Sequence, residues 1–266
     1  MAVHTRALAA FAVALLGAAG LTGCGNANAA SGAGAEFEAH MLGRPGVIDV
    51  YAGGTNNLPF VGNVSGSVEL SDDVTDDQIE AVVDRAGEYF AEHDSDRVNW
   101  SGIDVSVGFF SLRVEKTKTV NDDLRVLLRE VRADPLYVGA DVGTAWCDFA
   151  LATAPSAEAL VVGLDASVGL LATNPPAGGD VTVGFASEPG GFPEYQLTQR
   201  DGAGRPDAAI AALEALWAIA PPVTALADND SFAVTLADEA AVPAALAVVT
   251  GILAGSAVTE VTVEGP

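Results

Sequence analysis

Cysteine, histidine and acidic side chains are the groups with which this chain could do chemistry. The 266 residues include two cysteines, three histidines and 36 aspartates and glutamates. Cys147 lies in an alternating stretch in which Ala145 and Phe149 share its face, which predicts a buried, inert thiol in a strand. A nucleophilic cysteine needs a base such as histidine. We place His40 in a tether and His93 after a helix end, so neither is expected to activate it.

One group of acids has helical spacing and could gather a divalent cation or a basic partner. A solvated helix face is the ordinary interpretation, and acids near a helix start also favour the helix dipole. The acidic segments 72–73 and 228–230 lack the ligand spacing and the glycine of a calcium loop. We therefore predict no metal site. The helical row consists of Asp77, Glu80, Asp84 and Glu88.

Catalytic and cofactor motifs are absent from the sequence. It contains no Gly-x-Ser-x-Gly elbow, His-Glu-x-x-His pair, phosphate loop or dinucleotide fingerprint. A carboxylate pair for glycoside cleavage cannot be selected from so many acids without a structure. We expect no cofactor and assign no catalytic residue.

The charge of the chain restricts its partners. Its formal net charge is −24, and its only lysines are Lys116 and Lys118. Nucleic-acid binding requires basic side chains that neutralise phosphates, so no nucleic-acid partner is expected. An anionic lipid surface would also repel this chain. The acidity suits cations or basic partners, and it also suits simple solubility.

The first 24 residues have the architecture of a secretion signal. Segment Met1–Gly23 carries Arg6, no acidic residue and the apolar run Ala7–Leu21, which is too short for an uncleaved membrane span. The sequence Leu-Thr-Gly-Cys at 21–24 resembles the lipobox of bacterial lipoproteins. The resemblance implies that Cys24 receives a diacylglycerol and becomes the first residue of the mature protein.

This resemblance implies a location. Residues 1–23 are expected to be a signal peptide and residues 24–45 a lipidated, flexible tether rich in Gly and Ala. The acyl chains on Cys24 would make the membrane a partner, since two chains anchor a protein where one does not. We expect the protein to be lipid-anchored to the outer face of the bacterial cytoplasmic membrane.

A repeat runs through the rest of the chain. Segments 104–108, 180–184 and 260–264 alternate Val with other residues, mostly Ser or Thr, and they start 76 and 80 residues apart. This alternation predicts strands. Each follows an apolar helical pattern, and each helix follows a further strand. The predicted helices are Thr75–Glu92, Pro155–Leu171 and Val242–Ala254; the strands before them are Val64–Leu70, Ala145–Ala152 and Ser231–Leu236.

Local signals support the helix starts. Thr75 and Gln78 form a capping-box pattern. Pro155 and Pro243 fall in first turns, where proline is tolerated. In the third helix we expect Leu246 on the apolar face.

Together these elements predict an α+β fold. We expect repeated strand-helix-strand (ferredoxin-like) modules, with helices packed on one face of a mainly antiparallel sheet. Residues 46–142 would form the first α/β module, and residues 143–266 a second α/β region with two further repeat units. The remaining predicted elements are Val47–Tyr51, Phe109–Lys116, Asn121–Arg132, Pro193–Gln199 and Pro206–Ile219.

One segment has the composition of a recognition loop. Segment Ala52–Phe60 combines glycines, amides, Leu, Pro and Phe, although a wide turn between two strands is the ordinary interpretation. Trp100 precedes a repeat strand whose counterparts have no aromatic, so it is either a surface anchor or a lid on the core. The candidate recognition residues are Thr55, Asn56, Asn57, Phe60 and Trp100.

We therefore expect a membrane-anchored extracytoplasmic lipoprotein that acts as a non-catalytic binding or assembly module, with a protein or cell-envelope partner. One alternative is a solute-binding protein of a transporter, which a deep pocket between two lobes would favour. The other is a cell-envelope hydrolase, which a buried carboxylate pair or a perturbed histidine in a cleft would favour.

Overall fold

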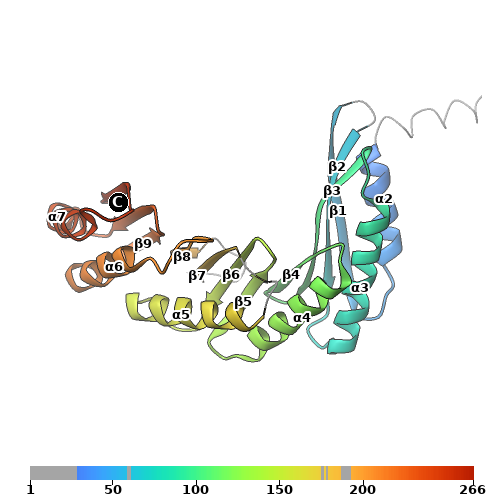
Figure 1. The fold of residues 1–266 in the computed structure, drawn as a ribbon, viewed down its shortest axis with the longest axis horizontal. Helices are drawn as coiled ribbons and strands as arrows, with labels where there is room; N and C mark the ends of the chain where they lie inside the picture. The colour runs from blue at the N-terminus through green and yellow to red at the C-terminus, as the bar shows by residue number, and fades with distance from the viewer. Residues whose placement is uncertain (1–28, 59–60, 175–176, 178, 187–192) are drawn as a thin grey trace, which may run out of the picture.

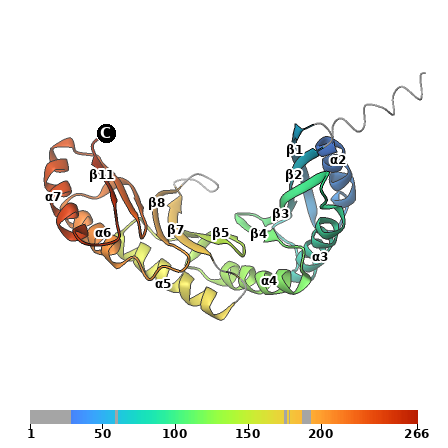
Figure 2. The same cartoon turned by 45° about the horizontal axis from the view of Figure 1, so that its top comes forward.

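The protein is an arc of sheet covered by helices on its outer side. The computed structural model describes residues 29–58, 61–174, 177, 179–186 and 193–266. Over these residues it has one eleven-stranded sheet, in which the strands lie in the order in which they occur in the sequence. The sheet bends so that its strands line the inner side and the helices follow the outer side (Figures 1 and 2). The architecture is therefore a two-layer α+β structure.

The described elements are as follows. The strands are β1 Val47–Leu58, β2 Val61–Leu70, β3 Val98–Val107, β4 Phe110–Val114, β5 Tyr137–Val142, β6 Trp146–Leu151, β7 Asp180–Ala186, β8 Pro193–Gln199, β9 Pro222–Ala227, β10 Ser231–Leu236 and β11 Glu260–Glu264. The helices are α2 Ala29–Met41, α3 Asp76–His93, α4 Lys118–Ala133, α5 Ala157–Thr173, α6 Asp207–Ile219, α7 Val242–Leu253 and the 3₁₀ turn η1 Glu239–Ala241.

A hairpin followed by a helix is the structural unit. β1 and β2 pair antiparallel, and α3 then leads to β3, which pairs parallel with β2. The same sequence of pairings recurs with helices α4, α5, α6 and α7. Antiparallel and parallel pairings therefore alternate across the whole sheet, as in a short solenoid of stacked units.

This topology imposes alternating handedness on the crossovers. Strand direction reverses from one parallel pair to the next, because a hairpin lies between them. The strand order nevertheless advances in one direction, and the helices stay on one face (Figure 2). Successive crossovers must then have opposite hands. Since about 98% of such connections are right-handed, the left-handed members are an unusual feature of this fold.

The three predicted helices are confirmed, with ends that differ by at most two residues, as α3, α5 and α7. Thr75 caps α3, and both bonds of its capping box with Gln78 are present. Pro243 lies in the first turn of α7. The strands expected after these helices are β3, β7 and β11, which belong to every second unit and run in the same direction.

Two expectations about the sheet are wrong. The sheet is mixed rather than mainly antiparallel, because half of its pairings are parallel. A ferredoxin-like unit places a strand between the two parallel strands of its βαβ segment, whereas here those strands are direct neighbours. The predicted repeat is twice as long as the structural unit, because the predicted elements lack β5 and β9. The expected boundary at 142–143 falls in the β5–β6 hairpin, across which the sheet continues.

Period-2 alternation of the strands builds the core on one side. In β2, every second residue from Gly62 to Leu70 is buried, including Val64 and Val68, while the residues that alternate with them are exposed or half-buried. The helices cover this apolar face. The prediction that Leu246 lies on the buried apolar face of the third helix is wrong. Leu246 is 41% exposed, and α7 buries Ala245, Val249 and Leu253 instead.

Helix α2 corrects the prediction of a flexible tether over residues 24–45. Residues 29–41 are helical, and Phe37 and Met41 are fully buried. The Phe37 ring centroid lies 5.2 Å from those of Tyr89 and Trp100. The backbone of Gly66 lies so close to Phe37 that an added Cβ would be 2.8 Å from its ring. Composition suggested a tether because most residues of α2 are small, yet two large side chains suffice to dock it.

The helices of the described part of the chain share one further property. None is both long and apolar enough to cross a membrane.

We predict that Phe37→Ala undocks α2. Removing a buried phenylalanine costs about 3–5 kcal/mol, which a short helix with one apolar stripe cannot recover. Backbone amide hydrogens of residues 29–41 should then exchange with solvent much faster than in the parent. Glu36→Ala, an exposed position on the same helix, is the control. Unchanged exchange in Phe37→Ala would refute the docked position of α2.

Candidate functional site

The inner face of the sheet carries polar side chains because each strand alternates. In β5 and β6 the side chains of Val142, Cys147 and Phe149 are buried beneath the helices. Asp141 and Asp148 lie between these positions and therefore point to the opposite face. The arc of the sheet makes that face concave (Figure 2).

A continuous row of hydroxyl and carboxylate side chains crosses this face from β3 to β8. Adjacent members are direct register partners in neighbouring strands, so side chains from distant parts of the sequence become neighbours. The row consists of Ser106, Ser111, Asp141, Asp148, Thr182 and Thr198.

Hydrogen bonds hold the row in place. The Ser111 hydroxyl donates to Asp141 Oδ1 at 2.5 Å. The hydroxyl oxygens of Thr182 and Thr198 lie 3.1 Å apart. At the centre of the row, Asp141 and Asp148 are register partners, so two acidic side chains lie directly opposite each other.

Arginines form ion pairs with acids on both sides of this pair. Arg113 Nη1 lies 2.9 Å from both carboxylate oxygens of Asp104, and its Nη2 donates to the Ser101 carbonyl at 2.8 Å. The guanidinium packs against Gly102, whose φ is +151° and where an added Cβ would be only 2.2 Å from Arg113 Cζ. Glycine is therefore required at this bulge.

The second arginine lies further along the sheet. Arg200 Nη1 contacts Asp180 at 3.1 Å, and Nη2 contacts Asp228 at 2.6 Å. The other Asp228 oxygen accepts the backbone N–H groups of Asp230 and Ser231. Asp228 is thus fully occupied by protein partners, as expected of a structural residue and not of a calcium ligand.

Asp141 and Asp148 lack such a partner. Among the described residues, neither forms an ion pair within 4.0 Å. Removal from solvent raises the pKa of Asp141, and Asp104 and Asp148 raise it further, while Ser111 and Arg113 oppose the rise. Removal from solvent likewise raises the pKa of Asp148; a hydrogen bond with Thr182 opposes this rise, and Asp180 adds to it. Asp148 is exposed on this face. The pair therefore has an unmet preference for positive charge.

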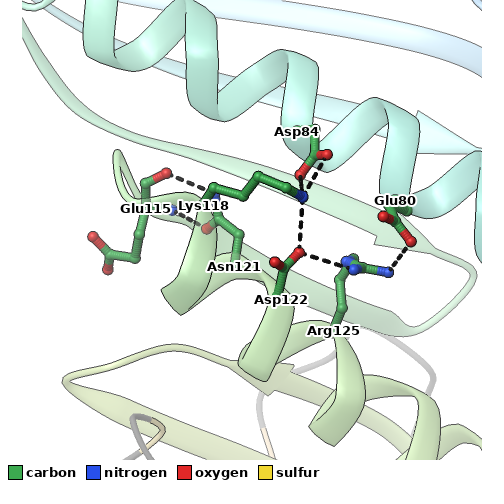
Figure 3. Close-up of polar contacts among 7 residues, drawn as sticks. All are labelled: Glu80, Asp84, Glu115, Lys118, Asn121, Asp122 and Arg125. Carbon is green, nitrogen blue, oxygen red and sulfur yellow. Dashed lines mark hydrogen bonds and ion pairs between the residues drawn. The ribbon is translucent and has the colours of Figure 1, made fainter.

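The acidic row on α3 has its basic partners within the chain (Figure 3). Arg125 Nη1 contacts Glu80 at 2.9 Å, and Lys118 Nζ contacts Asp84 at 2.7 Å. Asp122 joins both cations, at 2.9 Å from Arg125 and 3.0 Å from Lys118, and the hydrogen bond from Arg125 lowers the pKa of Asp122. These exposed ion pairs join the facing surfaces of α3 and α4, and solvent screens them, so each contributes little to stability.

A buried amide completes this contact between the helices. Asn121 is 1% exposed; its Nδ2 donates to the Glu115 carbonyl at 2.8 Å, and its Oδ1 accepts the Glu115 N–H at 2.7 Å. Gly87 of α3 lies against it, where an added Cβ would be 2.7 Å from Nδ2. The two hydrogen bonds of Asn121 hold the start of α4 against the end of β4.

Three hollows of the described surface lie on the helix side. One of about 30 Å³ separates α3 from α4 and is lined by Ile79, Arg125 and Leu128. Another of about 300 Å³ lies where Arg44 and Pro45 meet α3, and a third of about 250 Å³ lies beside Lys116 and Lys118. Asp77 lines the second hollow, while Glu88 pairs with Arg85 at 3.4 Å.

The structure does not assemble the predicted recognition loop. β1 continues to Leu58, so Thr55, Asn56 and Asn57 belong to a strand, and Phe60 lies outside the described residues. Asn56 Oδ1 accepts the Ala30 N–H at 3.2 Å, which ties β1 to α2.

Trp100 is not a surface anchor. It is 3% exposed in β3 and packs against Phe37 and Tyr89 under α2 and α3. The bulge at Ser101–Gly102 shifts the alternation of buried and exposed residues along β3, so the sequence pattern did not place Trp100 in the core.

The remaining candidates from the sequence are the cysteines and histidines. Cys24 lies outside the described residues. Cys147 is 0% exposed and its thiol donates to the Gly143 carbonyl at 3.4 Å, which confirms the expected burial. His93 ends α3 and stacks on Tyr89 at 3.9 Å, with His40 of α2 on the same ring at 5.0 Å.

Sequence reasoning missed the inner-face carboxylates. The alternation at 145–151 did place Asp148 on the face opposite Cys147, which was a usable signal. Its neighbour Asp141 belongs to β5, a strand that was not predicted, and only the register of the β5–β6 hairpin brings them together.

We predict that Asp148→Asn stabilises the protein at neutral pH by about 0.2–1 kcal/mol, the typical size of a cross-strand charge effect. The folded-state pKa of Asp148 is raised, so its charged form disfavours the folded state near neutral pH. The gain should disappear as pH falls through that raised pKa towards the ordinary value of 3.8, because the parent side chain is then protonated. Urea unfolding across this pH range measures the difference.

Asp104→Asn is the matched control, since it removes the partner of Arg113. It should lower the free energy of unfolding by up to about 1 kcal/mol at neutral pH. If both variants lose stability, Asp148 has a cationic partner and our interpretation of the pair is wrong.

Comparison with known proteins adds no family to this description. Searches of the chain against protein-family models, curated proteins and solved structures find no match.

Proposed function

We propose that this protein is a non-catalytic binding module whose concave sheet face holds an extended ligand. This proposal rests on the unbroken row of Ser, Thr and Asp side chains across six strands of that face. Solenoid-like proteins commonly bind along such concave surfaces. A row of donors and acceptors spread over many strands suits a ligand that lies across the strands.

The chemistry of the ligand follows from the charges. Arg113 already pairs with Asp104 on one side of the centre, and Arg200 with Asp180 and Asp228 on the other. Asp141 and Asp148 remain without a cation, and burial raises the pKa of both. A basic side chain or amine of the ligand placed between them would supply the missing charge, in keeping with the net charge of −24.

The alternatives receive less support. A solute-binding protein needs two lobes around a cleft, whereas the described residues form one continuous sheet. A hydrolase finds its best support in the Asp141–Asp148 pair, whose pKa values are raised as a general acid requires. That pair lies on an open sheet surface, and the hollows described above lie on the other side of the molecule. Catalysis generally needs an enclosing site, so we favour binding.

The proposed location remains the membrane surface, with anchoring through acyl chains on Cys24. α2 begins shortly after this residue and is docked on β1 and β2 through Phe37 and Asn56. The N-terminal end of the arc would then lie near the bilayer, and the connection between lipid and sheet would be shorter than the 24–45 tether first expected.

We predict that tetralysine binds the full chain through the central pair. The double variant Asp141→Asn/Asp148→Asn should weaken the Kd at least tenfold in calorimetry at low salt. Binding should also weaken as pH falls through the raised pKa values of the pair, because protonation removes the negative charge. Asp201→Asn/Glu214→Gln, which changes the net charge equally at exposed positions, is the control. Equal losses in both double variants would mean that only overall charge matters.

We also predict that Cys24→Ala releases the protein from the membrane fraction without changing its thermal melt. The acyl chains would be lost, while the core lies entirely in later residues. Fractionation in high salt separates lipid anchoring from charge-dependent adhesion. A variant that still sediments with membranes would contradict the lipoprotein interpretation.

A further inference from the structure

The last strand leaves one edge of the sheet open. β11 pairs with β10 on one side, and no described strand lies on its other side. Its backbone groups on that side can therefore accept another strand. This surface is distinct from the concave row, which ends at β8.

The helix above this edge is also incompletely covered. α7 buries Ala245, Val249 and Leu253 against the sheet. Its flanks expose Leu246 by 41%, Val248 by 37% and Ile252 by 36%. By helical geometry Leu246 lies on one flank of the buried stripe, and Val248 and Ile252 lie on the other. Since α6 covers one flank only, apolar surface remains on the other, next to the open edge.

The side chains of β11 specify what can pair with it. Glu260, Thr262 and Glu264 are exposed, whereas Val261 and Val263 point towards the helix layer. A second copy of β11 pairing antiparallel would set Glu260 opposite Glu264 at both ends, which is repulsive. Charge repulsion therefore disfavours pairing between the β11 edges of two copies of the protein.

We propose that β11 accepts a strand from another protein, and that this strand alternates basic and branched apolar residues. Its lysines or arginines would lie beside Glu260 and Glu264 on the inner face. Its valines or isoleucines would extend the row of Val261 and Val263 and meet the exposed flank of α7. Backbone hydrogen bonds supply the affinity in this type of recognition, and the alternation supplies the specificity.

The test uses a synthetic hexapeptide that alternates Lys and Val, titrated into the full chain and followed by fluorescence anisotropy. Binding should be lost when alternate peptide nitrogens are methylated, because the added strand can no longer hydrogen-bond. Glu260→Lys/Glu264→Lys should raise the Kd at least tenfold and should bind a Glu-Val hexapeptide instead, which shows that the variant is folded.

The control is Asp201→Lys/Glu214→Lys, which makes the same charge change at exposed sites away from the edge. It should leave the Kd within about twofold of the parent. Failure of the parent to bind the peptide, binding of the methylated peptide, or an equal loss in the control would overturn the proposal. So would a dimer of the parent in light scattering that Glu260→Lys/Glu264→Lys disperses, since the edge would then belong to a second copy.

Discussion

One-sided coverage of the sheet is the constraint on which the rest of the structure depends. Every hairpin is followed by a helix on the same face, so each strand must alternate apolar and polar residues. The apolar half of each strand builds the core with the helices. The other half is exposed along the whole arc and is free to carry function. A sheet with helices on both faces would have had no such surface.

The charges are divided between these two faces. On the outer side, the acids of α3 meet Lys118 and Arg125 of α4, so charge joins successive units. On the inner side, two arginines neutralise most of the central acids but leave Asp141 and Asp148 without a cation. Such a pair is a cost to stability that the remainder of the core must offset, as is common at binding surfaces.

The unusual crossovers have a related cause. The units progress in one direction while strand direction alternates, so helices on a single face require opposite hands in turn. Helix–helix contacts such as the α3–α4 seam and the Glu130–Asn174 hydrogen bond between α4 and α5 hold neighbouring units in this arrangement. β11 is the last strand of the described sheet, and a stack of units generally needs a terminal cap to cover its last helix.

The sequence by itself determined the secondary elements whose signals are local. The capping box at Thr75, the placement of Pro243 and the alternation around Cys147 fixed helix starts and strand faces, because these depend on residues a few positions apart. Tertiary structure decided the rest. α2 is a helix only because Phe37 has Tyr89 and Trp100 to pack against. The Asp141–Asp148 pair exists only through the register of two strands, which sequence spacing does not reveal, since pairing depends on hydrogen bonds between strands and not on pattern within one.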